Sequence, residues 1–152
     1  MKVYRLSKSK FAGDLLGHGA EIAGGRWNSK GTPLIYTSQS RALCLVEVAV
    51  HLPVGIIPHD YVLIEIEIPD ETKVQVIEEK LLPTDWNSFP HSPVTQNLGD
   101  NFVKENSNLL LKVPSAVVSG DFNYLINPRH PQINQVFIVS TKPFGFDERL
   151  FT

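Results

Sequence analysis

The sequence predicts an α+β fold, in which one compact single domain over residues 1–152 is built from a mixed β-sheet flanked by helices. Short apolar segments rich in β-branched and aromatic residues recur along the chain between turn-forming residues, as is typical of strands. Two other segments carry helical periodicity, one with a capping serine at its start and the other with a proline suited to the first turn. A chain of 152 residues also has the usual size of one domain with one hydrophobic core.

Four segments are predicted to be strands, at residues 3–6, 33–38, 61–69 and 136–140. In the third of them isoleucine alternates with Glu65 and Glu67 at a period of two residues. A strand with this pattern packs one face against the core and leaves the other in water. We therefore expect both glutamates to lie at the surface.

Residues 40–52 are predicted to form a helix, because Ser40 can cap its start and Pro53 follows its end. The residues expected to face the core are Ala42, Leu45, Val46, Ala49 and Val50. A second helix is predicted within residues 92–106, where Pro93 suits the first turn and Gly99 is the least favourable position.

Five glycines lie in the segment GHGAEIAGGRWNSKG, residues 17–31. Glycine permits left-handed backbone and close approach to a ligand, so we predict a loop here that cradles a ligand. The pattern is not G-x-G-x-x-G and no Walker lysine follows, so it does not indicate Rossmann or P-loop nucleotide binding.

Composition excludes several classes of function. The formal net charge is -2 with both signs mixed along the chain, which argues against direct nucleic-acid binding. No apolar run approaches the ~18–20 residues of a membrane span and no secretory signal is apparent, so we expect a cytoplasmic protein without membrane contact. The five histidines lack zinc-site spacing, so no metal is expected. Cys44, the single cysteine, is expected to be a buried structural thiol.

Arg26 and Glu47 are the most suggestive charged residues. Arg26 follows two glycines, where a guanidinium can grip a pyrophosphate, although a surface arginine stacked on Trp27 explains the pattern equally well. Glu47 interrupts an apolar helix, where burial is costly unless a cation or ligand compensates. The alternative is a solvated pair with His51 one turn later, which the spacing alone favours.

Two further residues could share a cleft with Glu47. Tyr36 ends a predicted strand just before the helix, although a tyrosine in a strand is more often a packing residue. Ser115 follows Pro114 without a Gly-x-Ser-x-Gly elbow or triad partners, which favours a hydrogen-bonding role over a covalent one.

Four separated segments, in their order and spacing, resemble the RES-domain family, named for its arginine, glutamate and serine. The segments are GGRWNSKGTPLIYTS, RALCLVEVAVHL, VPSAVVSGDFNYLINPRHP and PFGFDERL. Arg26, Glu47 and Ser115 correspond to the three naming residues, and Tyr36 to a tyrosine in the same pocket. The chain departs from the family where Phe102 stands in place of a frequent tryptophan, which leaves an aromatic residue there.

The resemblance implies a fold like that of ADP-ribosyltransferases and a toxin of a RES-Xre toxin-antitoxin pair. Such a toxin takes NAD as its substrate, with an Xre-type helix-turn-helix antitoxin as its partner. Arg5 and Asn123 match family positions expected near the ligand.

The resemblance also assigns a role to each pocket residue. Glu47 would stabilise the positive charge on the ribose, Arg26 would anchor the pyrophosphate, Tyr36 would orient nicotinamide and Ser115 would hydrogen-bond the substrate. Three functions stay open: NAD cleavage by water or phosphate, mono-ADP-ribosylation of a protein, and non-catalytic binding to a helix-turn-helix repressor. A homodimer is left open as well.

Overall fold

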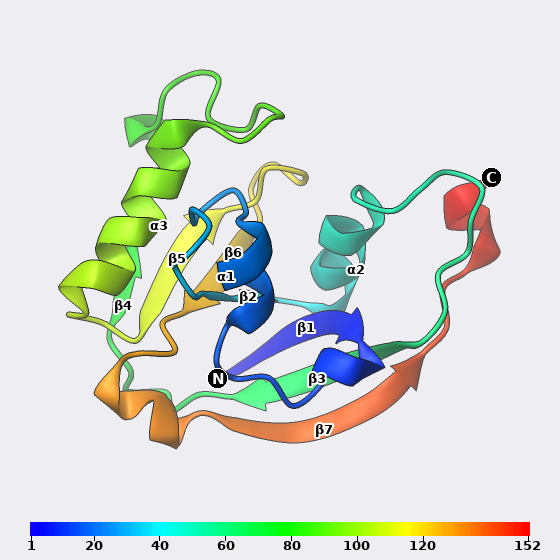
Figure 1. Ribbon diagram of the computed structural model, residues 1–152, viewed down its shortest axis with the longest axis horizontal. Coiled ribbons are helices and arrows are strands. Elements are labelled where there is room, and N and C mark those ends of the chain that lie inside the picture. Colours follow the sequence, from blue (N-terminus) through cyan, green and yellow to red (C-terminus); the bar gives the residue numbers. More distant parts are fainter.

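A seven-stranded sheet with the order β4-β5-β6-β2-β1-β3-β7 forms the centre of the computed structural model, which describes residues 1–152 (Figure 1). The strands are β1 (Lys2–Lys8), β2 (Ile35–Ser38), β3 (Tyr61–Glu67), β4 (Val74–Val76), β5 (Leu110–Pro114), β6 (Phe122–Ile126) and β7 (Phe137–Phe144). Only β4 and β5 pair in parallel, and all other neighbours are antiparallel. The predicted α+β class with a mixed sheet is confirmed.

Three α-helices and four short 3-10 helices accompany the sheet. The former are α1 (His18–Ala23), α2 (Arg41–Ala49) and α3 (Pro93–Glu105), and the latter are η1 (Ser9–Phe11), η2 (Glu79–Leu81), η3 (Pro131–Gln135) and η4 (Glu148–Phe151). The Ser40 Oγ accepts the Leu43 N–H at 3.1 Å and the Ser92 Oγ accepts the Val94 N–H at 3.1 Å. Both predicted helices are confirmed with these caps, although α2 ends at Ala49 rather than at residue 52.

The sheet consists of two groups of strands that are joined at one residue pair. Tyr4 of β1 faces Ser38 of β2, and the register between these two strands contains no other pair. In Figure 1, β1, β3 and β7 run across the view, whereas β5 and β6 run at a steep angle to them. A cluster of ten buried residues, including Ile64 of one group and Ile126 of the other, joins the two groups.

Each of the two longer helices packs on one part of the sheet. Phe102 and Val103 of α3 belong to a buried cluster with Leu111 of β5 and Leu125 of β6. The α2 helix contacts β1 and β2, and its Cys44 packs in a separate cluster with residues of β1 and η4. The α3 helix therefore covers the part of the sheet formed by β5 and β6, and α2 covers the part formed by β1 and β2.

The face of α2 that packs differs from the predicted one. The buried residues are Leu43 and Cys44, whereas Val46 is 36% exposed and Val50 is 54% exposed. Nearly every residue from 42 to 50 is apolar, so periodicity could not decide which side meets the sheet. The correction matters for function, because Glu47 follows Leu43 and Cys44 by about one turn and so lies on the packed side.

Residues 17–31 are not a continuous loop, because α1 occupies residues 18–23 within them. The Asp14 carboxylate accepts the N–H groups of Leu16 at 2.7 Å and His18 at 3.2 Å, which provides partners at the start of this helix. Strands β4, β5 and β6 were not among the predicted strands. The β5 strand is buried on both faces and therefore lacks the alternation that marks a half-exposed strand.

Glu65 also differs from expectation, because its side chain is only 17% exposed and lies 3.3 Å from Lys2 and 3.4 Å from Arg41. Glu67 is 43% exposed, as predicted for a surface residue. Cys44 is buried as expected, and burial raises the pKa of its thiol to about 12. None of the helices is long and apolar enough to cross a membrane.

Candidate active site

Glu47 is held by two hydrogen bonds from side chains far away in the sequence. Its Oε1 accepts the Ser115 hydroxyl at 2.6 Å and the Asn123 side-chain amide at 2.7 Å. The other carboxylate oxygen, Oε2, has no hydrogen-bond partner in the protein. It is not fully buried, so a ligand can reach it. The solvated pair with His51, which the spacing favoured, does not form. One oxygen of Glu47 is thus committed to the protein and the other is available.

Ser115 and Asn123 reach Glu47 from neighbouring strands. Ser115 follows the last residue of β5, and Asn123 lies in β6 opposite Val113 of β5. The Ser115 Oγ also accepts the N–H groups of Val117 at 3.1 Å and Val118 at 3.0 Å. Its proton points to Glu47 and both lone pairs accept backbone N–H groups, so Ser115 orients the carboxylate and has no lone pair free to attack a substrate.

Arg26 lies beside this carboxylate but does not form an ion pair with it. Its Nη1 donates to the backbone carbonyls of Trp86 at 3.1 Å and Ser88 at 2.9 Å. Burial lowers the pKa of Arg26, and the negative charge of Glu47 opposes this effect. The Nε and Nη2 groups make no hydrogen bond within the protein, so they are free to bind an anion.

Tyr36 supports the turn that carries Arg26. Its hydroxyl donates to the Asn28 Oδ1 at 2.7 Å and accepts the Trp27 N–H at 3.0 Å. Burial raises the pKa of this hydroxyl. A Cβ on Gly25 would lie 2.7 Å from the Tyr36 oxygen, which explains why this turn needs glycine. The structure therefore gives Tyr36 a role in shaping the Arg26 turn.

Helix α3 holds the same turn from outside. The Gln96 Nε2 donates to the Gly25 carbonyl at 3.0 Å, and the Asp100 carboxylate accepts the Ser29 N–H at 2.9 Å. Between them, Gly99 lies so close to Trp27 that an added Cβ would be 1.5 Å from the Trp27 carbonyl oxygen. The unfavourable glycine of this helix is therefore explained by backbone contact with the Arg26 turn.

Arg5 is not joined to Glu47 by any hydrogen bond or ion pair. It lies in β1, and its Nη1 donates to the Asp14 carbonyl at 2.8 Å. Burial lowers its pKa, while Asp14 and the neighbouring Cys44 oppose that shift. The structure thus brings Glu47, Ser115 and Asn123 into direct contact and Arg26 within reach of the Glu47 charge. Tyr36 supports the Arg26 turn, and the Arg5 side chain is hydrogen-bonded only to the loop after β1.

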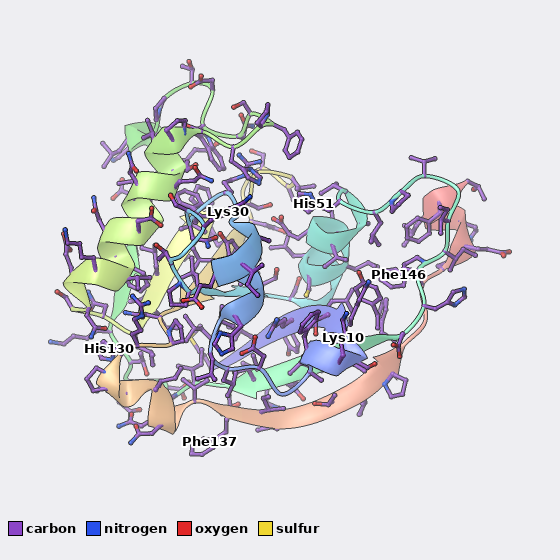
Figure 2. The ribbon with its side chains drawn as sticks, viewed as in Figure 1. Lys10, Lys30, His51, His130, Phe137 and Phe146 are labelled. Carbon is purple, nitrogen blue, oxygen red and sulfur yellow. The ribbon has the colours of Figure 1, made fainter.

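His91 is a neighbour of Arg26 that the sequence did not single out. Its Nδ1 is the one buried side-chain nitrogen or oxygen without a hydrogen-bond partner. Burial lowers its pKa, and the positive charges of Arg26 and His51 add to this effect. Figure 2 shows His51 at the end of α2. The lowered pKa keeps His91 neutral at pH 7, so Arg26 supplies the lasting positive charge that favours an anionic ligand here.

Other residues that build the site carry weak sequence signals. Asn28, Gln96 and Asp100 hold backbone atoms of the Arg26 turn, and Ser38 contacts Asn123. Asn28 and Ser38 both stood inside the segment GGRWNSKGTPLIYTS, but nothing in the sequence singled out either residue. Polar residues in a helix or strand are otherwise common, so their partners became visible only in three dimensions.

Two surface hollows lie away from Glu47. One of about 410 Å³ is lined by residues of the turn after β3 and of η3, and the other, of about 390 Å³, lies beside the end of α3. Both are lined almost entirely by polar residues, with one hydrophobic residue each. The Glu47 region is identified as the candidate active site by its hydrogen bonds and charges, and not by the size of a hollow. No group of three His, Cys, Asp or Glu side chains could hold a metal ion.

Comparison with known proteins gives a consistent result. The family model described as "RES domain" matches residues 2–147. A protein named "Prs ADP-ribosylating toxin" from Sphingobium sp. is 38% identical over 141 residues, which cover 91% of this chain and 88% of that protein. "Toxin Res" from Yersinia enterocolitica is 36% identical over 153 residues and covers 99% of both chains. "Toxin Res" from Pseudomonas putida is 38% identical over 142 residues, covering 91% and 93% of the two chains.

The fold also resembles a solved structure. The crystal structure of the M. tuberculosis MbcT-MbcA toxin-antitoxin complex contains a chain that superposes with a TM-score of 0.75 at 21% identity, covering 95% of this chain and 84% of that one. At this identity the likeness concerns the fold. Together with the family match over almost the whole sequence, these relatives show that the chain belongs to the RES domain family.

Proposed function

We propose that this protein is a toxin that binds NAD and breaks the bond between nicotinamide and ribose. The observation that carries the proposal is the state of Glu47, whose Oε1 is held by Ser115 and Asn123 while its Oε2 stays free. All three residues lie at positions where the resemblance to the RES family places pocket residues. The relatives named as toxins support the biological role.

The chemistry requires one well-placed carboxylate. When the C1′–N bond breaks, both electrons go to the nitrogen, so the cationic nicotinamide leaves as a neutral molecule and the ribose becomes positively charged. A carboxylate beside the ribose stabilises that charge, as in glycoside hydrolysis. Because the leaving group departs neutral, it needs no proton from an acid. Water or phosphate then bonds to C1′ and releases a proton to solvent.

Arg26 is the candidate for holding the pyrophosphate. Its free Nε and Nη2 groups could donate two hydrogen bonds to phosphate oxygens, and its other amino group is anchored on the Trp86 and Ser88 carbonyls. The positive charge of Arg26 favours the same ligand, and the buried His91 Nδ1 near it is a polar atom without a partner in the protein. Nicotinamide contact by Tyr36 and NAD contact by Arg5 stay predictions, and Asn123 is better assigned to holding Glu47.

A second function, mono-ADP-ribosylation of a protein, is favoured by the name of the Sphingobium relative, which is an ADP-ribosylating toxin. The two functions share the pocket and differ only in whether a protein side chain replaces water or phosphate at C1′. Analysis of the ribosyl product distinguishes them.

We also propose an antitoxin partner of the Xre helix-turn-helix type. The solved relative of similar fold is a toxin crystallised with its antitoxin, which supports a partner of that role. NAD is an intracellular metabolite, so the proposed site of action is the cytoplasm. Binding to such a partner without catalysis is the remaining alternative, and a homodimer stays a prediction that light scattering can check.

The test is incubation of the purified protein with NAD, without and with phosphate, followed by measurement of nicotinamide and the ribosyl product. Glu47→Gln keeps an oxygen to accept from Ser115 and Asn123 but removes the charge, so we expect a fold like the wild type and at least about 100-fold slower release. Glu105→Gln, an exposed glutamate of α3, is the matched control and should match wild type. Equal rates in the Glu47→Gln and wild-type proteins would exclude Glu47 from catalysis.

A further inference from the structure

A buried hydroxyl lies behind Glu47, one contact further from the proposed substrate. Ser38, the last residue of β2, is 4% exposed, and its Oγ donates to the Asn123 Oδ1 at 2.7 Å. The two residues lie opposite each other on β2 and β6. The Asn123 Nδ2 in turn donates to the Glu47 Oε1 at 2.7 Å. A continuous chain of hydrogen bonds therefore runs from Ser38 to the carboxylate.

The direction of this chain follows from what each group can donate. A carboxylate only accepts hydrogen bonds, so the NH2 end of the Asn123 amide must face Glu47. The amide oxygen then faces Ser38, whose hydroxyl can donate to it. Ser115 supplies the second donor to the same Glu47 oxygen. In the reversed amide the oxygen would face the Glu47 carboxylate, where two acceptors repel each other, so Glu47 selects the orientation and the donating Ser38 hydroxyl reinforces it.

We propose that Ser38 is a positioning residue for NAD cleavage. It holds the Asn123 amide with its NH2 group toward Oε1 of Glu47, so that Asn123 and Ser115 both donate to Oε1 and Oε2 is kept for the substrate. The inference rests on the function proposed above, and Ser38 itself touches no substrate. Without its hydroxyl the Asn123 oxygen has no donor from β2, the amide is held only through its contact with Glu47, and Ser115 alone still fixes Oε1 firmly.

The position of Ser38 suits this role. It forms the pair with Tyr4 that joins the two groups of strands, so its backbone is held by neighbours on both sides, β1 and β6. Its hydroxyl is therefore presented to Asn123 from a well-anchored strand. Asn123 lies between this anchor and helix α2, which carries Glu47.

The first test compares kcat and KM for NAD in Ser38→Ala, Ser38→Thr and wild-type proteins. Because misplacement of a reacting group by about 1 Å can cost roughly 100-fold in rate, we expect Ser38→Ala to lower kcat about 10- to 100-fold. KM should change by less than about threefold, since Arg26 still binds the pyrophosphate. Ser38→Thr keeps the donor and should recover most of kcat.

Thr37→Val provides the matched control. Thr37 adjoins Ser38 in the same strand, is 3% exposed, and donates through Oγ1 to the Tyr124 carbonyl at 2.5 Å. Thr37→Val removes a buried hydroxyl with one hydrogen bond, as Ser38→Ala does. The Thr37 side chain, however, points to the opposite face of the strand from Ser38 and so away from Asn123. We expect a similar loss of stability with an unchanged kcat. A fall in kcat of the same size in both variants would overturn the inference.

A second readout does not depend on activity. In protein labelled with ¹⁵N-asparagine, the Asn123 side-chain signals are identified by their loss in Asn123→Asp, and Ser38→Ala should shift them while Thr37→Val leaves them in place. Unchanged Asn123 signals, or a kcat equal to wild type in Ser38→Ala, would overturn the role of Ser38 alone. If the wild-type protein releases no nicotinamide, the proposed NAD cleavage is overturned, and with it the role of Ser38 in that reaction. The spectrum would then test only whether Ser38 contacts Asn123.

Discussion

Replacing Gly99 of α3 by alanine should push the helix away from the turn that carries Arg26. The added Cβ would lie 1.5 Å from the Trp27 carbonyl oxygen and 2.6 Å from its carbonyl carbon. Real Cβ atoms essentially never approach closer than 3.0 Å, so the two backbones must separate by about 1.5 Å. Neither partner is the end of a flexible side chain, so the separation has to be taken up by the helix or by the turn.

The effect on stability follows from the contacts on either side of Gly99. A separation of this size breaks or weakens the Gln96–Gly25 and Asp100–Ser29 hydrogen bonds, each with a net contribution of about 0.5–1.5 kcal/mol. Overpacking costs a further 1–3 kcal/mol or so, against a gain of about 1 kcal/mol in helix propensity. We therefore expect the free energy of unfolding to fall by roughly 2–4 kcal/mol, which lowers Tm by several degrees for a chain of this size.

Urea unfolding of Gly99→Ala, Gly19→Ala and the wild type measures this effect. Gly19 also lies in a helix, α1, but a Cβ there would meet nothing within 4 Å, so Gly19→Ala should be neutral or stabilising by up to about 1 kcal/mol. In Gly99→Ala, NAD binding should weaken as well, because the Arg26 turn moves. If Gly99→Ala were as stable as Gly19→Ala, the close packing of α3 on the Arg26 turn would be refuted.

Two other perturbations test the site and its surroundings. Tyr36→Phe leaves the Trp27 N–H and the Asn28 oxygen without their partner, so it should cost about 1–3 kcal/mol of stability. It should also weaken NAD binding nearly as much as Tyr36→Ala does. Calorimetry of both variants checks this, and a much milder loss of binding in Tyr36→Phe would point to stacking by the ring. The pKa of Cys44 is raised by burial from 9.0 to about 12, so between these pH values the folded state binds more protons than the unfolded state. The free energy of unfolding should accordingly decrease as pH rises from about 9 to about 12, and this decrease should be smaller in Cys44→Ala. Urea unfolding of both proteins at several pH values measures the free energy of unfolding against pH. The same dependence on pH in both proteins would contradict a buried neutral thiol.

Prediction of the fold succeeded where a local signal was strong. Residues 40–52 start with a serine cap and residues 92–106 contain a proline suited to the first turn, and the two helices begin at Arg41 and Pro93. The alternating residues of β3 likewise identified a strand with one face buried. The β5 strand, which is apolar on both faces, and the three-residue β4 strand have no such local signal, so the order and the split of the sheet could not be derived from periodicity.

The sequence by itself determined which residue types are available for the site, and the family resemblance marked Arg26, Glu47 and Ser115 among them. Only the tertiary structure decided their relations. Glu47 had a local partner in His51 by spacing, but the packing of α2 turns its carboxylate to Ser115 and Asn123, which are 68 and 76 residues away. Hydrogen bonds between such distant residues depend on strand register and helix rotation, and these are set by the burial of the whole chain rather than by neighbouring residues.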